Sequence, residues 1–247
     1  MGRRAYIMEL QKLLSYTRQA VKDYHLIEQN DKIMIGLSGG KDSIALLYAL
    51  SHLRRFYPNS FSIHAVTVDM GFSNYDTTSL QKLCDLLQVP FTKISTKIGT
   101  IIFEERKEKN PCALCAKFRR GALLNAAQEL GCNKIAYGHH KDDVIETMLL
   151  SLFFEGRFYS FGPYTYFPDR NIAVIRPLIY VSEKEVIGFI KKQNLLPIKN
   201  PCPVDQHTKR EEMKNLLKEL NHQYPGIKKR LFSAIQNGKI EDWDRKK

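Results

Sequence analysis

The chain has 247 residues, of which 43% are hydrophobic and 26% charged, values that are ordinary for a globular protein with a sizeable core. No stretch reaches the roughly 18 uninterrupted apolar residues of a membrane span, and the first residues lack the apolar region of a secretory signal, so we expect a cytoplasmic protein without a membrane partner. The formal net charge is +12, with basic residues spread along the whole chain. This balance favours a polyanionic partner, and a generically basic surface is the alternative.

The hydrophobic pattern predicts an amphipathic helix over 3–28, followed by short β-rich runs that alternate with longer helical patterns. We expect five strands, at 32–37, 61–68, 91–95, 133–138 and 172–176. We expect further helices at 42–56, 75–88, 113–130, 142–155, 182–193, 207–221 and 225–237. This alternation is typical of an α/β fold with a doubly wound, mostly parallel five-stranded sheet and flanking helices, whose ligands lie at the carboxyl ends of the strands.

Two stretches lack a clear period and are predicted to be irregular: residues 153–170 and the segment after residue 196. The first is rich in aromatic residues, glycine and proline, and such a long loop can stack an extruded base or pack as a lid. We divide the chain into an N-terminal helical segment, a nucleotide-binding domain and a C-terminal helical extension, at residues 1–30, 31–196 and 197–247.

The sequence GLSGGKDS begins at Gly36, between a predicted strand and a predicted helix, where backbone N–H groups can converge on an anion. It is not a Walker A loop, because only three residues separate Gly36 from Gly40 and an aspartate follows the lysine, nor is it a dinucleotide fingerprint. Glycines allow a close backbone approach, while hydroxyls and a lysine add polar contacts. We predict a phosphate site made of Ser38, Gly39, Gly40, Lys41, Asp42 and Ser43. The alternative is a glycine turn in which Asp42 or Ser43 caps the helix.

The five cysteines are an odd number, so a disulfide framework is not expected. Cys112 and Cys115 have CxxC spacing at the start of a predicted helix, which brings both sulfurs to one side as metal ligands or as an exchanging dithiol. Cys202 is a candidate third ligand. Three thiolates can hold a [4Fe-4S] cluster with one iron left open, whereas structural zinc normally has four protein ligands. Cys84 and Cys132 are predicted to be small packed side chains.

The sequence YGHHKDDVIET follows a predicted strand and opens a helix, so we expect it at the same sheet edge as the phosphate loop. Asp142 and Asp143 can hold Mg²⁺ beside ATP phosphates, and His139 or His140 can bind a phosphate or assist proton transfer. In the structural alternative, Asp142 or Asp143 caps the helix and Glu146 completes a capping box.

Three arginines are candidates for contacts with phosphate or with an RNA backbone. Arg119 and Arg120 follow the CxxC on the same predicted helix, and Arg176 follows a predicted strand. The alternative is a solvated helix face.

SGGKDS resembles the PP-loop of the ATP pyrophosphatase superfamily. Later blocks resemble those of tRNA 2-thiocytidine synthetases, in the same order and over nearly the whole chain: CALCAKFRRGALL, KIAYGHHKDDVIETMLL, VIRPLIYVSEKEV and YPGIKKRLFSAIQN. The resemblance implies cleavage of ATP between its α and β phosphates, with the loop holding the pyrophosphate end. It also implies that adenine lies near Val68, Asp69 and Met70, which can equally be a buried strand end followed by a turn. We also place Gly138 and His139 in this nucleotide site.

The same resemblance implies that Cys112, Cys115 and Cys202 carry a [4Fe-4S] cluster. Many members have a second CxxC in the tail block, where this chain has CPVD with Asp205 at the later cysteine position. A single tail cysteine can still be the third ligand, and carboxylate ligation by Asp205 stays open.

The resulting hypothesis is tRNA thiolation that depends on ATP, Mg²⁺ and an iron–sulfur cluster. The C2 oxygen of an anticodon-loop cytidine (position 32) attacks the α phosphate, pyrophosphate leaves, and sulfur then displaces AMP to give 2-thiocytidine. The target base has to be exposed to reach the site. Arg119 and Arg120 are assigned to cofactor binding, and the residues assigned to catalysis are Lys41, Cys112, Cys115, Asp143 and Cys202.

A sulfur donor such as a cysteine desulfurase or free sulfide is expected, and a homodimer is a candidate assembly. Two alternatives stay open. One is a PP-loop enzyme that thiolates or desulfurates another nucleobase or a small substrate. The other is a non-catalytic, redox-sensing nucleotide-binding module that uses the CxxC as a switch.

Overall fold

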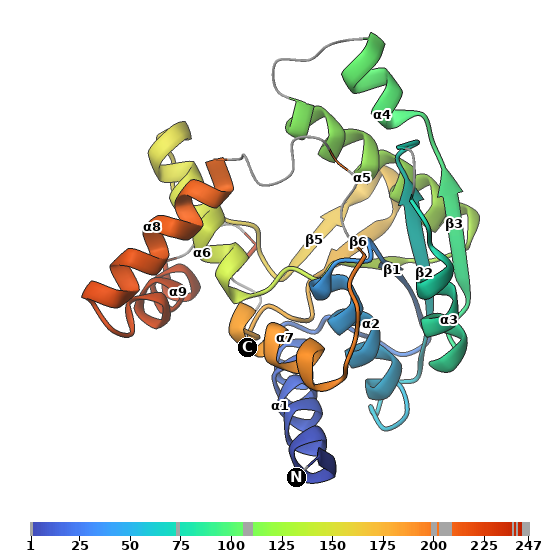
Figure 1. The fold of residues 1–247 in the computed structure, drawn as a ribbon, viewed down its shortest axis with the longest axis horizontal. Helices are drawn as coiled ribbons and strands as arrows, with labels where there is room; N and C mark the ends of the chain where they lie inside the picture. The colour runs from blue at the N-terminus through green and yellow to red at the C-terminus, as the bar shows by residue number, and fades with distance from the viewer. Residues whose placement is uncertain are drawn as a thin grey trace.

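The computed structural model describes residues 2–72, 75–105, 111–198, 202, 209–238, 240 and 242–243, with side chains described from Glu9 onward. Within these residues the centre of the fold is a six-stranded sheet in the order β3-β2-β1-β4-β6-β5 (Figure 1). Its strands are β1 (Asp31–Gly36), β2 (Phe61–Asp69), β3 (Phe91–Ser95), β4 (Lys134–Ala136), β5 (Tyr164–Phe167) and β6 (Ile172–Ile175). All neighbours pair in parallel except β5, which runs antiparallel to β6 at one edge. The predicted doubly wound α/β class is confirmed.

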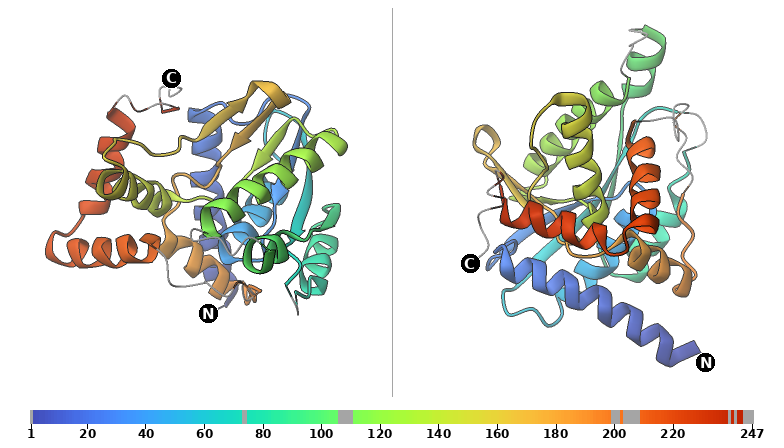
Figure 2. Two further views of the ribbon diagram at one scale, coloured as in Figure 1. Left: turned by 90° about the horizontal axis from the view of Figure 1, so that it is seen from above. Right: turned by 90° about the vertical axis from the view of Figure 1, so that its left-hand side faces the viewer.

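The helices lie on both sides of the sheet and at both ends of the chain (Figures 1 and 2). The α-helices are α1 (Gly2–Asp23), α2 (Lys41–Leu53), α3 (Thr78–Leu86), α4 (Ile98–Thr100), α5 (Pro111–Glu129), α6 (Lys141–Leu150), α7 (Glu183–Lys192), α8 (Lys209–Gln223) and α9 (Ile227–Asn237). Two π-helical turns, η1 (Ile101–Glu105) and η2 (Ser151–Glu155), continue α4 and α6, and η3 (Pro168–Arg170) is a 3-10 turn.

Alternation along β1 shows how the sheet divides the core. Ile33 and Ile35 point into the larger cluster, which packs against α2, α6 and α7, whereas Met34 points into a second cluster formed mainly by α5. All three side chains are fully buried, as expected for a central parallel strand with helices on both faces. The chain leaves β1 for β2 on one side and returns to β4 on the other, so the loops after β1 and β4 diverge at the carboxyl edge.

The terminal helices pack onto this core. The N-terminal helix α1 lies against α2 and α7, and the C-terminal helices α8 and α9 lie against α6 (Figure 2). No helix in the described parts of the chain is long and apolar enough to cross a membrane.

Besides small shifts of element boundaries, the structure differs from the sequence prediction in several details. The sheet has a sixth strand, because Tyr164–Phe167 pairs with β6 inside the stretch that was predicted to be a loop. The first helix ends at Asp23 instead of residue 28. The predicted helix over 142–155 is α-helical only to Leu150 and continues as η2. The helical turns over residues 98–105 were not predicted.

Candidate active site

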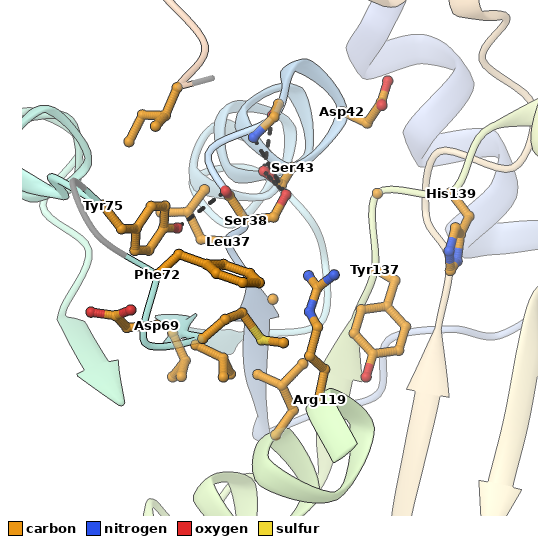
Figure 3. A pocket seen from close by; sticks show the side chains of 18 of the residues that line it. Leu37, Ser38, Asp42, Ser43, Asp69, Phe72, Tyr75, Arg119, Tyr137 and His139 are labelled. Atoms are coloured by element: carbon orange, nitrogen blue, oxygen red, sulfur yellow. Dashed lines mark hydrogen bonds between the residues drawn. The ribbon is translucent and has the colours of Figure 1, made fainter. Parts of the chain in front are cut away.

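A cavity of about 380 Å³ opens at the carboxyl ends of β1, β2 and β4, where the strand order changes direction (Figure 3). Such a switch point is where open α/β sheets bind their ligands. The lining combines a polar loop, an apolar wall and one arginine, and consists of Gly36, Leu37, Ser38, Gly40, Asp42, Ser43, Val66, Val68, Asp69, Met70, Phe72, Tyr75, Arg119, Leu123, Tyr137, Gly138, His139, Asp143 and Ile198.

The phosphate loop enters α2 without a side-chain cap. The chain turns at Gly39, whose φ of +82° lies in the left-handed region that favours glycine. Gly40 is the N-cap residue and supplies no side chain, so the first N–H groups of α2 remain available to a ligand. The hydroxyls of Ser38 and Ser43 lie beside them, 3.2 Å apart. The alternative prediction, in which Asp42 or Ser43 caps the helix, is wrong.

Lys41 lies beside the cavity and is not part of its lining. Its Nζ contacts Asp42 Oδ2 at 2.9 Å and Glu183 Oε1 at 3.1 Å. Burial opposes the ammonium charge, but these two carboxylates outweigh it and raise the pKa of Lys41. Glu183 also binds Lys214 Nζ at 2.7 Å. Lys41 is therefore held in its charged form at the start of α7.

The residues predicted to lie near adenine are found at the end of β2. Val68, Asp69 and Met70 all line the cavity. The Asp69 carboxylate binds Lys93 Nζ at 2.8 Å and accepts the N–H of Gly71 at 2.9 Å. Because its oxygens already have these partners, Asp69 shapes the wall through its backbone and its position, while Val68 and Met70 provide an apolar surface.

Two aromatic residues of this wall were not predicted. Phe72 and Tyr75 follow β2 and line the cavity (Figure 3). Tyr75 Oη donates to the Ser38 carbonyl oxygen at 3.2 Å and lies 2.8 Å from Thr67 Oγ1, so it fixes the outer side of the phosphate loop. The turn signals in GFSNYD indicate only a loop after the strand, and they do not reveal that it folds back over Ser38.

The loop after β4 packs tightly against the start of α2. A Cβ at Gly138 would lie 2.7 Å from the Asp42 carbonyl oxygen, so glycine is required here. His139 follows as a lining residue, and its ring packs against the Phe161 ring with 4.8 Å between the ring centroids. Burial and then the charge of Arg176 lower the pKa of His139 well below its usual range, so the ring is neutral. Its buried Nδ1 has no hydrogen-bond partner among the described residues.

The capping box of α6 is formed by His140 and Asp143. His140 Nδ1 accepts the Asp143 N–H at 3.3 Å, and Asp143 Oδ2 accepts the His140 N–H at 2.9 Å. The predicted box with Glu146 is therefore wrong. Glu146 lies one turn further along, 3.4 Å from Arg210, and burial followed by the nearby Asp143 charge raises its pKa to about 7.

The two adjacent aspartates point in different directions. Asp142 accepts the Glu183 N–H at 2.8 Å and binds Lys228 Nζ at 2.7 Å, so each of its oxygens has a strong partner from α7 or α9. Asp142 is absent from the cavity lining, whereas Asp143 belongs to it. Asp143 Oδ1 has only a 3.7 Å ion pair with Arg210. Among the carboxylate oxygens of the two aspartates, this oxygen is therefore the most available to a ligand.

The three predicted ligand cysteines are neighbours. Cys112 is exposed, and Cys115 and Cys202 are half-buried. Burial raises the pKa of Cys115, Arg119 opposes this, and the charges of Cys202 and Cys112 raise it further. These electrostatic effects on Cys115 indicate that the three thiols lie in the same region of the molecule. In the described part of the chain, however, no three His, Cys, Asp or Glu side chains come close enough together to hold a metal ion.

Two contacts connect the thiols with the cavity. Arg119 lines the cavity and points toward the phosphate loop (Figure 3), and its charge and a side-chain hydrogen bond lower the pKa of Cys115. Ile198 also lines it, and the Ile198 N–H donates to the Gly39 carbonyl oxygen at 2.9 Å. Ile198 lies four residues before Cys202 in the sequence, so the segment that leads to this cysteine starts at the cavity wall, while the three cysteines themselves are not lining residues.

Comparison with known proteins identifies the family of the chain. A family model described as PP-loop domain matches residues 9–220. A tRNA-cytidine(32) 2-sulfurtransferase of Pelobacter propionicus is 40% identical over 222 residues, which cover 89% of this chain and 82% of the relative. The chain belongs to the PP-loop family and, within it, to the tRNA-cytidine(32) 2-sulfurtransferases.

Two further matches agree with this membership. The tRNA-cytidine(32) 2-sulfurtransferase of Geobacter metallireducens is 36% identical over 231 residues, 92% of this chain and 89% of the relative. Among solved structures, the U34-tRNA thiolase NcsA from Methanococcus maripaludis with its [4Fe-4S] cluster superimposes with a TM-score of 0.75 at 26% identity. That match covers 92% of this chain and 79% of the other. The predicted family resemblance is confirmed.

Of the predicted arginines in this PP-loop protein, only Arg119 lines the cavity. The Arg120 guanidinium lies 6.0 Å from the centre of the ring of Phe167, a residue of the edge strand β5. Arg176 is 9% exposed, and its guanidinium donates to the Gly162 carbonyl oxygen at 2.7 Å. The prediction that Arg176 contacts an RNA backbone is wrong, because the side chain is buried and its guanidinium donates hydrogen bonds inside the protein. Asp205 lies outside the described residues.

Proposed function

We propose that this protein catalyses ATP-dependent thiolation of tRNA, replacing the C2 oxygen of cytidine 32 with sulfur. One observation carries the proposal: Arg119 borders the phosphate-loop cavity and at the same time hydrogen-bonds Cys115. In thiolation, ATP activates a base and sulfur then attacks the same carbon, so the phosphate loop and the cysteine thiols have to serve one site. The relatives named tRNA-cytidine(32) 2-sulfurtransferase support the choice of cytidine.

The cavity offers separate places for the parts of ATP. The uncapped N–H groups of α2, with the hydroxyls of Ser38 and Ser43, suit the phosphates. The apolar surface of Val68 and Met70 suits adenine. Arg119 lines the cavity and Lys41 lies beside it, so these two positive charges can stabilise the charge developing on the α phosphate and on the pyrophosphate.

Magnesium fits Asp143 better than Asp142. Carboxylate oxygens are preferred by Mg²⁺, and Asp143 lines the cavity with only a 3.7 Å ion pair at its Oδ1. Both oxygens of Asp142 hold α7 and α9 in place. We therefore assign metal binding to Asp143 and a structural role to Asp142.

The donor set fits a [4Fe-4S] cluster. Cys112, Cys115 and Cys202 are three neighbouring thiols, and Cys84 and Cys132 are buried in the core, so three sulfur ligands leave one iron open. When bound, such a cluster supplies an iron at which sulfide is activated for attack. Among the described residues no closed set of three ligands is formed, so the three thiols have to draw together when the cluster binds.

The chemistry then proceeds in two displacements. The C2 oxygen of the cytidine attacks the α phosphorus, the bond between the α and β phosphates breaks, and pyrophosphate leaves toward the α2 N-terminus. Sulfide next attacks C2, and AMP departs with the original oxygen. Neutral His139 is a lining residue of the cavity in which these steps take place, and its unpartnered Nδ1 is buried.

The proposed function also includes the partners, the location and the assembly of the protein. The net charge of +12 favours tRNA as the polyanionic partner. We place the protein in the cytoplasm, with a cysteine desulfurase or free sulfide as sulfur source and a homodimer as the candidate assembly. The division into residues 1–30, 31–196 and 197–247 stays a prediction.

Nucleoside analysis of tRNA tests the proposal. A strain that lacks this gene should lose 2-thiocytidine and retain 2-thiouridine, and the wild-type gene should restore it. Loss of 2-thiouridine alone would assign the protein to uridine, the base acted on by the structurally similar U34 thiolase. An unchanged nucleoside profile would favour the alternative hypothesis of a redox-sensing nucleotide-binding module.

A further inference from the structure

An exposed aromatic surface lies at the far end of α6. We call residues Leu152–Tyr159 the tip. Three phenylalanines dominate it: Phe153 is 62% exposed, Phe154 52% and Phe158 80%. Soluble proteins rarely expose several large rings side by side, and such clusters mark interaction sites.

The tip is an ordered element. The π-helical turn η2 presents Leu152, Phe153 and Phe154, and π-helical turns are frequent at functional sites. The Arg157 N–H donates back to the Ser151 carbonyl oxygen at 3.2 Å, and Arg157 Nε binds Glu155 at 2.6 Å. Beyond the tip, buried Ser160 is anchored by a 2.8 Å bond from its Oγ to the Val144 carbonyl oxygen. The rings are therefore held outward by a folded scaffold.

Positive charges lie directly over two of the rings. The Arg157 guanidinium is 4.6 Å from the centre of the Tyr159 ring, and Lys209 Nζ is 5.3 Å from that of Phe154. The side chains of Arg157 and Lys209 are 59% and 64% exposed. A mixture of accessible rings and cations is what single-stranded nucleic acid requires, because bases stack on the rings while cations meet the phosphates.

The position of the tip suits a ligand that also reaches the cavity. Helix α6 begins beside the cavity with Asp143 and leads directly to the tip, roughly 20 Å away at 1.5 Å per residue. Helices α5 and α6 pack on opposite faces of the sheet, and in Figure 1 the end of α6 and the start of α5, which carries Cys112, both reach the upper part of the view. An anticodon loop inserted between them would touch both.

We propose that the tip is a stacking surface for unpaired anticodon-loop nucleotides next to the target base. This inference rests on the proposed function only in taking tRNA as the substrate. Arg157 and Lys209 are paired with Glu155 and Glu212, so self-association through the tip is the competing outcome, and the measurement of dimerisation below detects it.

The test compares RNA binding by Phe153→Ala and Phe158→Ala with that of Phe56→Ala. Phe56 is a matched control, because it is 54% exposed but follows the end of α2 that lies away from the phosphate loop. Binding of an unmodified anticodon stem–loop RNA is measured by fluorescence anisotropy at several salt concentrations. A blunt RNA duplex of equal length serves as the second probe, and ATP affinity is measured in parallel.

Each tip variant should bind the stem–loop about 5-fold to 100-fold more weakly than the wild type, the range expected for loss of one stacked base. Duplex binding, ATP affinity and the salt dependence should not change, and Phe56→Ala should behave as wild type. Lys209→Ala should instead flatten the salt dependence, by a slope of about 0.7 for one phosphate contact.

Stem–loop binding that is unchanged in both tip variants would overturn the inference, and so would a loss of dimerisation, measured by light scattering, without a loss of RNA affinity. The two proposals fail separately. If the wild type thiolates tRNA but the tip variants bind and thiolate normally, only the stacking surface is wrong. If binding depends on the tip but no thiolated cytidine forms, only the proposed function is wrong.

Discussion

The backbone N–H of Ile198 donates a 2.9 Å hydrogen bond to the carbonyl oxygen of Gly39. This bond joins the segment that leads to Cys202 to the phosphate loop, and it explains why two distant parts of the sequence share one cavity. A Cβ at Gly39 would lie 3.1 Å from Ile198 Cβ, so the contact also depends on the absence of a side chain.

Gly39→Ala should therefore destabilise the protein, whereas Gly40→Ala should not. At Gly39 the left-handed φ of +82° and the Ile198 contact act together, and we expect a loss of about 1–3 kcal/mol in the free energy of unfolding. At Gly40 the backbone is extended and a Cβ meets only Ser38 Oγ, at 3.5 Å, so the change should stay within about 0.5 kcal/mol. Chemical denaturation without nucleotide measures both. Equal losses would show that the left-handed turn carries no special cost.

Lys41→Ala and Cys112→Ser should separate nucleotide chemistry from iron binding. Without Lys41, pyrophosphate release should fall by at least about 100-fold, as expected when one charge-stabilising donor is removed, while iron content is retained. Cys112→Ser should keep ATP affinity and lose iron, because one of three thiol ligands is removed. Anaerobic iron analysis and a pyrophosphate assay distinguish the two. Loss of both properties in Lys41→Ala would mean that the Lys41–Glu183 ion pair serves mainly to fold the site.

Arg119→Ala should make Cys115 less reactive, and Arg120→Ala should leave it unchanged. Arg119 lowers the pKa of Cys115 through its charge and a hydrogen bond, whereas Arg120 lies over the Phe167 ring. Removing Arg119 should move the pH profile of Cys115 alkylation to higher pH, because the thiolate is the reacting form. Iron-free protein and mass spectrometry of the labelled peptide give this profile. A shift of the same size in both variants would indicate a general field effect instead.

Much of the fold could be predicted from sequence, because its signals are local. The alternation of β-rich runs with helical periods gave five strands in nearly their observed places, and the turn at GLSGGKDS marked the cavity. The sixth strand was missed because Tyr164–Phe167 has only four residues, stands at a sheet edge and follows a glycine- and proline-rich stretch. Short edge strands carry little pattern of their own, since only pairing with β6 defines them.

Many residues of the site could be predicted from the sequence, but the directions in which their side chains point could not. Adjacent aspartates look alike in sequence, yet Asp142 turns to Lys228 and Asp143 turns to the cavity, because helix geometry separates neighbours by about 100°. Arg176 carries the same charge as Arg119, but long-range packing buries it against Gly162. The contact between Ile198 and Gly39 joins residues far apart in the chain, and no local pattern encodes it.

Glu146→Gln should stabilise the protein at alkaline pH and change little near pH 5. The pKa of Glu146 is about 7 in the folded protein, above its ordinary value, because the carboxyl is buried close to Asp143. A raised pKa means that the folded state favours the protonated form, so its contribution is complete below about pH 4.5 and is lost as the pH rises through 7. Glutamine cannot ionise, and at pH 8 it should be more stable than glutamate by about 2–3 kcal/mol, reduced by whatever the half-exposed Arg210 recovers. Unfolding free energies at pH 5 and pH 8 measure the effect, with the exposed Glu129→Gln on α5 as the control that should show no pH-dependent difference. A difference that stayed constant between the two pH values would show that Glu146 is ionised throughout and that its ion pair with Arg210 outweighs its burial.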